Sequence, residues 1–338
     1  MASSPDFLRE EATQEAPGTE LHGRRMHIIS ELRYPSRWYT KLLMLILALA
    51  FFAVLASSAI AGFLVYRIVK PQRSSTEISM ASFPGRPEIL NFDVPELGKR
   101  EGWFFPGRRG AATIVLCHGY ESSGGELLTL VSALQDHQYN AFVFDFAAHG
   151  KSDGVTTLGF READELRQAV NALAARNDLD GGRFGFWGYN LGAYAALREA
   201  ENDKRVRALV LDSVYDQPEQ MVKLGVEHNG LGTLPFIVRS TELSFDYLNN
   251  GHRHDAPLSS KLLALNGVHT LFIEAQDDPE LAAITRRMYL KAPEPREEAV
   301  IPHGNFASLS EPEKREYENR VVSFFLLHLP PVGVRATR

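Results

Sequence analysis

The sequence contains a single cysteine, Cys117, and little excess charge of either sign. One cysteine cannot form a disulfide within the chain or a multi-cysteine zinc site, so we expect a fold held together by packing alone. The 36 basic and 42 acidic side chains give a formal net charge of -6, which offers no general attraction to the phosphates of nucleic acid. We therefore expect no nucleic-acid partner, and the sequence predicts no cofactor and no metal ion.

Charged side chains are also missing from the 25 residues from Leu42 to Tyr66. As an α-helix this run is about 37 Å long, whereas the hydrocarbon core of a bilayer is about 30 Å thick. A cleaved signal peptide is disfavoured because the run is long and is preceded by 41 residues. A buried core helix is disfavoured because the run has no polar face. The sequence therefore predicts a flexible tail at 1–41 and a transmembrane anchor at 42–66.

Basic residues flank the predicted anchor on both sides. Those before it are Arg24, Arg25, Arg33, Arg37 and Lys41, and those after it are Arg67, Lys70, Arg73 and Arg86. The cytoplasmic flank of a membrane span usually carries more lysine and arginine than the opposite flank. The small excess before the anchor predicts a single-pass membrane protein with a cytoplasmic N-terminus and its C-terminal domain outside the cytoplasm.

Beyond a polar linker expected at 67–84, short apolar runs alternate with helix-like segments. The runs lie at 113–116, 141–144, 184–186, 208–211 and 270–273. Their composition is typical of strands buried on both faces, and strands separated by helices predict βαβ units. The sequence therefore predicts one α/β domain at 85–330, with a mostly parallel sheet flanked by helices.

Two of the loops that follow these runs carry a specific pattern. Residues 145–154 read DFAAHGKSDG, and residues 184–196 read FGFWGYNLGAYAA. These segments resemble the loop after the fourth strand and the nucleophile elbow of the α/β-hydrolase superfamily, especially its serine aminopeptidase-like members. The resemblance implies the α/β-hydrolase fold with a short lid inserted at about 212–268. It also implies an oxyanion hole formed by the backbone N–H groups of Tyr120 and Leu191.

The centre of this elbow departs from the family pattern. The family has serine at the centre of G-x-S-x-G, whereas this chain has Asn190. An amide nitrogen carries no removable proton near neutral pH, so Asn190 cannot act as an activated nucleophile. Downstream, the resemblance places Asp278 at the position of the catalytic acid and Asn305 at that of the catalytic histidine. Two of the three triad positions are therefore asparagine.

These departures predict a membrane-anchored pseudo-hydrolase, which binds a small acyl or lipid-like ligand or a protein without efficient turnover. The alternative is an active esterase, thioesterase or peptidase of the serine-hydrolase type. Such an enzyme needs His303 as its base, in a remodelled loop, and a nucleophile such as Ser122, Ser123 or Tyr189. None of these three hydroxyl groups lies at the tip of the elbow.

Two further alternatives have less support from the sequence. Deamidation of Asn190 would create an aspartate nucleophile, but Asn-Leu is an unfavourable deamidation site and the base is still missing. The residues HRHD at 252–255 include two histidines that suit a metal ion, but their surroundings are typical of a solvated turn in the lid. Cys117 itself is interpreted as a small core residue at a strand end rather than as a nucleophile.

Overall fold

The computed structural model describes residues 37–74, 87–252 and 255–331 of the chain. The predicted tail therefore lies almost wholly outside the described residues, as does the predicted linker from residue 75 onward. The chain divides into two compact units, Met1–Ala59 and Ile60–Arg338. The first described helix, α2 (Trp38–Val69), contributes residues to both units.

Helix α2 is long and apolar enough to cross a membrane. It contains 32 residues, and its most apolar window has a mean hydropathy of 2.6 and is 6% buried. The helix includes the whole predicted anchor and continues from Arg67 to Val69, which the sequence assigned to the linker. The helix therefore ends three residues later than the predicted span.

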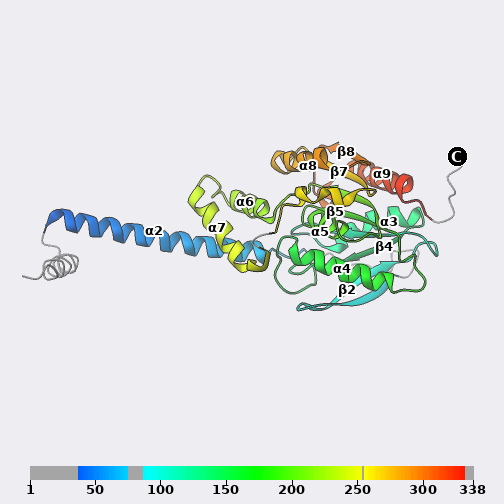
Figure 1. Ribbon diagram of the computed structural model, residues 1–338, viewed down its shortest axis with the longest axis horizontal. Helices are drawn as coiled ribbons and strands as arrows, with labels where there is room; N and C mark the ends of the chain where they lie inside the picture. The colour runs from blue at the N-terminus through cyan, green and yellow to red at the C-terminus, as the bar shows by residue number, and fades with distance from the viewer. Residues whose placement is uncertain (1–36, 75–86, 253–254, 332–338) are drawn as a thin grey trace, which may run out of the picture. The chain divides into compact units, whose positions relative to one another are not determined.

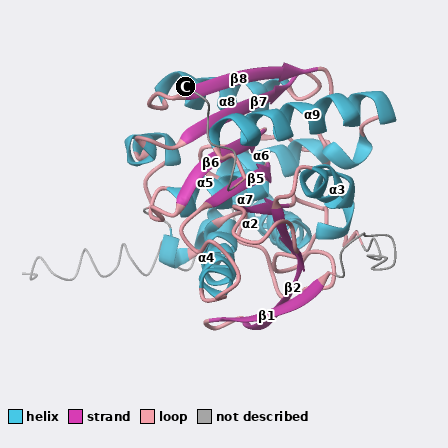
Figure 2. Cartoon of the chain, turned by 90° about the vertical axis from the view of Figure 1, so that its right-hand side faces the viewer, coloured by secondary structure: helices cyan, strands magenta, loops and turns pink. Residues whose placement is uncertain are grey.

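The second unit is built around one eight-stranded sheet, with strand order β1-β2-β4-β3-β5-β6-β7-β8. The strands are β1 (Glu88–Val94), β2 (Gly98–Phe105), β3 (Thr113–Cys117), β4 (Asn140–Phe144), β5 (Phe184–Tyr189), β6 (Val206–Asp212), β7 (His269–Ala275) and β8 (Arg296–Ile301). Strand β2 pairs antiparallel with β1 and β4, and the remaining pairs are parallel. Figure 2 shows the sheet from β8 at one edge to β1 at the other. The predicted, mostly parallel sheet is confirmed.

Helices cover both faces of this sheet (Figure 1). One core cluster joins the sheet to α4 (Phe160–Ala174), α5 (Leu191–Ala200) and α8 (Pro279–Lys291), and the other joins it to α3 (Leu128–Asp136) and α9 (Glu311–His328). Every residue of β3 and β4 is buried, as expected for strands covered on both faces. Cys117 lies in the first cluster, and complete burial raises the pKa of its thiol far above the usual range. It is therefore a core residue and not a thiolate.

The segment between β6 and β7 forms the region expected to be a lid. It contains α6 (Pro218–His228), α7 (Pro235–Leu248) and the short 3-10 turns η3 (Asn250–His252), η4 (Leu258–Ser260) and η5 (Leu262–Leu265). The last turns of α2, which belong to the second unit, pack against these two helices. Val65 and Ile68 of α2 share a buried cluster with Val222 of α6 and Phe245 of α7. The end of the apolar helix is thus part of the core beneath the lid.

Candidate functional site

The sharp turn between β5 and α5 places Asn190 at its tip, with φ 33° and ψ -95°. A positive φ is uncommon for a residue other than glycine and marks a strained backbone. The neighbouring glycines permit the turn. A Cβ at Gly188 would lie 2.4 Å from the backbone of Gly192, and a Cβ at Gly192 would lie 2.0 Å from the carbonyl oxygen of Cys117. The strand and helix therefore meet too closely for any side chain at either glycine.

The side chain of Asn190 turns back onto the two backbone amides that the sequence assigned to the oxyanion hole. Its Oδ1 atom accepts a hydrogen bond from the N–H of Tyr120 at 2.8 Å and another from the N–H of Leu191. Two N–H donors need an acceptor, so the amide oxygen and not the amide nitrogen faces them. Asn190 is buried, with an exposed fraction of 7%. An uncharged carbonyl oxygen thus lies between the two N–H groups.

The loops after β7 and β8 are joined by a hydrogen bond to Asp277, whereas the sequence predicted Asp278 as the acid of the site. Asp278 accepts a hydrogen bond from the N–H of Leu281 at 3.0 Å and so caps the N-terminus of α8. Its neighbour Asp277 accepts from the N–H of Gly304 at 2.9 Å, directly before Asn305. Asn305 is exposed, with a positive φ of 48°. The carboxylate that contacts the loop of Asn305 is therefore Asp277.

His303 contacts helix α9 rather than the elbow. Its Nδ1 lies 2.7 Å from Oε1 of Glu313, and 61% of its side chain is exposed. Hydrogen bonds from Ser310 and from His303 lower the pKa of Glu313 to about 2. Of the alternative nucleophiles, the Ser122 hydroxyl donates to Glu126 at 2.6 Å. These contacts do not assemble a base and a nucleophile at the tip of the elbow.

The strand order, the sharp turn at Asn190 after β5 and the loops after β7 and β8 define a recognisable architecture. A family profile described as the alpha/beta hydrolase fold matches residues 112–242. The chain has the α/β-hydrolase fold. The matched segment begins one residue before β3, includes the turn at Asn190 and extends into α7.

Two sequence relatives and one solved structure illustrate the range of similarity. The uncharacterized protein YfhR of Escherichia coli K12 is 25% identical over 257 residues, which cover 73% of this chain and 84% of YfhR. The uncharacterized protein YqkD of Bacillus subtilis is 26% identical over 220 residues, covering 63% of this chain and 70% of YqkD. The solved structure of the Pyrococcus furiosus esterase Pf2001 is 21% identical, has a TM-score of 0.59, and covers 78% of this chain and 98% of the esterase. At this identity the likeness to the esterase is one of fold.

One buried carboxylate beside Asn190 was not predicted from the sequence. The backbone oxygen of Asp212, at the end of β6, accepts from the N–H of Asn190 at 2.9 Å. Its carboxylate accepts from the hydroxyls of Tyr317 at 2.7 Å and Ser213 at 2.9 Å. Burial raises the pKa of Asp212 to about 6, although the two hydrogen bonds lower it. An acidic residue directly after the apolar run at 208–211 was the available signal.

The loop before Tyr120 is held by a neutral histidine. The Nε2 atom of His118 accepts from the N–H of Phe146 at 2.9 Å, so the ring proton lies on Nδ1 and donates to the Gly119 oxygen at 2.8 Å. Burial lowers the pKa of His118 to about 4. His118 therefore ties the loop after β3 to the loop after β4 and positions the N–H of Tyr120.

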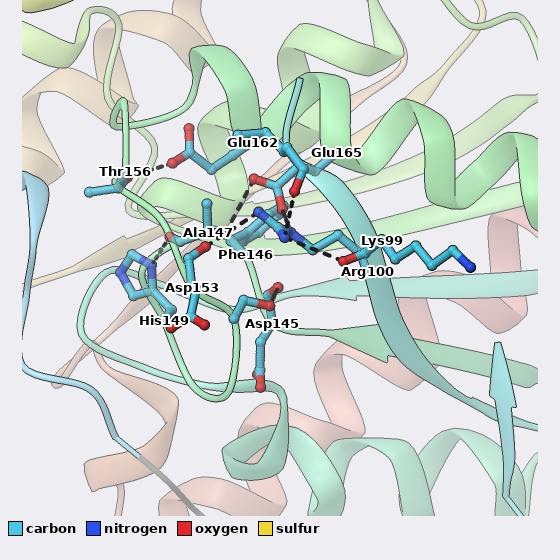
Figure 3. A network of polar contacts seen from close by, with 12 residues as sticks. Lys99, Arg100, Asp145, Phe146, Ala147, His149, Asp153, Thr156, Glu162 and Glu165 are labelled. Atoms are coloured by element: carbon cyan, nitrogen blue, oxygen red, sulfur yellow. Dashed lines mark hydrogen bonds and ion pairs between the residues drawn. The ribbon is translucent and has the colours of Figure 1, made fainter. Parts of the chain in front are cut away.

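Two buried glutamates fix the loop between β4 and α4 (Figure 3). Glu162 accepts hydrogen bonds from the hydroxyls of Thr156 and Thr157. Glu165 accepts from Nε of Arg100 at 3.1 Å, and burial together with the charge of Glu162 raises the pKa of Glu165 to about 7. The network holds Thr156 in place at the edge of the site.

The end of α2 is hydrogen-bonded to both of these loops. The hydroxyl of Tyr120 donates to the carbonyl oxygen of Ile68 at 2.9 Å, and the N–H of Thr156 donates to the carbonyl oxygen of Val69 at 3.0 Å. The last carbonyl groups of a helix have no partner within it, so these bonds satisfy two of them. The apolar helix therefore ends against the loop that supplies an amide to Asn190.

Proposed function

We propose that this chain is a membrane-anchored pseudo-hydrolase, an α/β-hydrolase-fold protein that binds a ligand or a protein without efficient hydrolytic turnover. The observation that carries the proposal is the contact of Asn190 Oδ1 with the N–H groups of Tyr120 and Leu191. In an acyl-transfer enzyme such a pair of donors stabilises the oxygen of the tetrahedral intermediate. Here an acyl oxygen must first displace the amide oxygen of Asn190.

The other triad positions support the same proposal. A catalytic triad acts as a unit, and loss of either its nucleophile or its base removes most of the rate. Asn190 offers no nucleophile, and the side-chain amide of Asn305 is not a useful base. The contact of His303 with Glu313 favours a surface role over that of a substitute base. The contacts of Ser122 and His303 therefore do not support the active-hydrolase alternative.

The membrane part of the proposal depends on α2, whose length and hydropathy suit a single span. The basic flanks favour a cytoplasmic N-terminus and an α/β-hydrolase domain outside the cytoplasm. An acyl or lipid-like compound is the ligand class that we propose, because the apolar end of α2 packs beside the lid and contacts the oxyanion loop. A protein partner is the second class of ligand.

Chemical labelling of the purified full chain in detergent tests the missing activity. We expect no covalent labelling by a fluorophosphonate probe and no hydrolysis of short-chain p-nitrophenyl esters. The Ser122→Ala and Ser123→Ala variants serve as controls for adventitious nucleophiles. Labelling that disappears in one of these variants, together with ester hydrolysis that is lost on His303→Ala, would establish the active-enzyme alternative instead.

A further inference from the structure

Helix α7 presents two apolar sides, and only one of them is buried. Ile237 and Phe245 point into the domain. Phe236, Leu243 and Tyr247 are spaced seven and four residues apart, so they share one side of the helix, different from the side of Ile237 and Phe245. Their exposed fractions are 58%, 44% and 81%. We call these three residues the outer face of α7. Large apolar side chains on one exposed helix face usually mark an interaction surface.

This outer face adjoins the end of the apolar helix. A groove of about 480 Å³ lies between α2 and α7, and it is mostly apolar. Its walls are Gly62, Val65, Tyr66 and Val69 of α2 and Leu243, Ser244, Tyr247 and Leu248 of α7. Figure 1 shows α7 beside the last turns of α2. The exposed side of the lid and the final part of the predicted span therefore share one surface.

The residues of α2 in this groove mark its depth relative to a bilayer. Gly62, Val65 and Tyr66 are the last residues of the uncharged run, and Arg67 and Lys70 follow. The ammonium group of Lys70 lies 5.6 Å from the centre of the Tyr66 ring. A tyrosine next to basic residues is typical of the boundary between lipid chains and head groups. Whichever way the helix is oriented, α7 lies at the level where α2 leaves the apolar layer.

We propose that the outer face of α7 is embedded in the bilayer surface and that the groove between α2 and α7 holds an acyl chain of a bilayer lipid. This inference rests on the proposed membrane anchor. One wall of the groove is the span itself, so its neighbours at that depth are lipid chains and not water. An amphipathic helix buries its apolar face at the boundary of head groups and chains, which suits Phe236 and Leu243.

The proposal also gives the lid a defined relation to the site. Phe245, on the buried side of α7, packs in one cluster with Ile68 and Val69. The carbonyl oxygens of those two residues accept hydrogen bonds from Tyr120 and Thr156. Lipid contact on the outer side of α7 therefore stabilises a helix whose inner side packs against the end of α2. The end of α2 in turn accepts the hydrogen bonds from Tyr120 and Thr156.

Fluorescence quenching by lipids tests this inference in the full chain. In a Cys117→Ala background, single cysteines replace Leu243 or Tyr247 on α7, Leu55 in the apolar run, or Leu327 on α9, and each carries an NBD fluorophore. Leu327 is 72% exposed and Leu55 is 55% exposed, so both are matched leucine controls. The proteins are reconstituted in phosphatidylcholine vesicles with and without doxyl-labelled lipid. We expect strong quenching at positions 55, 243 and 247 and several-fold less at 327.

The outcomes separate this inference from the proposed function. Quenching at position 55 combined with values at 243 and 247 equal to that at 327 overturns the lid contact and leaves the anchor intact. Fluorophores at 243 and 247 that are shielded from both doxyl lipid and aqueous iodide indicate a second copy or another protein on this face, which also overturns the proposal. No quenching at position 55 overturns the membrane anchor and the lid contact together.

Discussion

The hydroxyl of Tyr120 donates to the backbone carbonyl of Ile68 at 2.9 Å, and so joins the loop after β3 to the last turn of α2. The backbone N–H of the same tyrosine donates to Asn190 Oδ1 at 2.8 Å. One residue thus contacts the apolar helix through its side chain and the elbow through its main chain. The end of the helix and the amide that contacts Asn190 are therefore linked through a single residue.

Removal of the Tyr120 hydroxyl is expected to loosen the helix end without changing the elbow. Tyr120→Phe leaves the carbonyl of Ile68 without its donor, which costs about 1 kcal/mol of stability. We expect faster hydrogen exchange at the amide of Thr156, because that amide bonds to the neighbouring carbonyl of Val69. Exchange is measured by mass spectrometry on peptides covering residues 155–158.

Tyr139→Phe is the matched control for this prediction. The hydroxyl of Tyr139 is buried and donates to the carbonyl of Leu329 at 3.0 Å. Tyr139→Phe therefore removes the same type of hydrogen bond, but one that does not involve α2. A similar loss of stability with unchanged exchange at residues 155–158 is expected. Equal exchange at 155–158 in the two variants would contradict a specific link between Tyr120 and the end of α2.

Restoring the family residues at two positions is expected to create hydrolase activity. Asn190→Ser removes the amide oxygen from the N–H groups of Tyr120 and Leu191 and supplies a hydroxyl, and Asn305→His supplies a base. The double variant should react with a fluorophosphonate probe and hydrolyse p-nitrophenyl esters, whereas Asn190→Ser alone should label only slowly. Adding His303→Ala should change neither rate. A double variant that folds but stays silent would count against the assignment of Asn305 to the histidine position.

The contact of Asn190 Oδ1 with two backbone N–H groups makes a separate prediction about stability. Asn190→Ala leaves the buried N–H groups of Tyr120 and Leu191 without their acceptor, which costs about 1–3 kcal/mol. Asn190→Asp keeps an oxygen between them and adds a charge at the N-terminus of α5, so its stability at pH 7 should equal or exceed that of the parent. Thermal unfolding of the three proteins measures the order. If Asn190→Ala is as stable as the parent, the hydrogen bonds to the Asn190 amide oxygen do not contribute to stability.

The Asn190→Asp variant also tests the deamidation alternative. It contains the aspartate that deamidation would create, but Asn305 still occupies the histidine position. We expect no ester hydrolysis by this variant. Turnover would show that a base other than the predicted one serves the elbow, and the pseudo-hydrolase proposal would have to be abandoned.

Much of the fold could be predicted from the sequence because its central strands are nearly continuous apolar runs. The runs at 113–116, 141–144, 184–186, 208–211 and 270–273 all lie within β3 to β7. The resemblance of residues 145–154 and 184–196 to the α/β-hydrolase superfamily implied the particular fold. In the structure, contacts of the glycines around Asn190 leave no space for a Cβ, as that turn requires. Local composition therefore predicted the alternation of strands and helices, and the family resemblance predicted the fold.

The contacts of the site could not be predicted, because they depend on side-chain direction and on residues distant in sequence. Whether Asn190 turns toward the amide of Tyr120, 70 residues away, depends on its rotamer. Asp277 and Asp278 are adjacent acids, and only the start of α8 distinguishes the helix cap from the loop contact. Within α2, the buried Leu64 looks like the exposed Phe63 in sequence, since both are apolar.

The stability of the protein should depend on pH through Asp212. Burial raises the pKa of this carboxyl from 3.8 to about 6, so the folded state favours its protonated form. That stabilisation is complete below the unfolded pKa and is lost as pH rises through the folded pKa, a difference on the order of 3 kcal/mol. Asp212→Asn removes this titration. The variant should therefore lose less stability than the parent between about pH 4.5 and about pH 7.5, two values that lie on either side of the folded pKa.

Thermal unfolding of both proteins across this range measures the difference. Other buried carboxyls, such as Glu165, whose pKa burial raises to about 7, titrate in both proteins and cancel in the comparison. Tyr317→Phe provides a second variant, because the Tyr317 hydroxyl donates to the Asp212 carboxylate at 2.7 Å and stabilises its charge. Its loss should raise the pKa further and deepen the fall in stability toward pH 7.5. Parallel stability curves for the parent and Asp212→Asn would mean that the hydrogen bonds from Tyr317 and Ser213 fully offset the cost of burial.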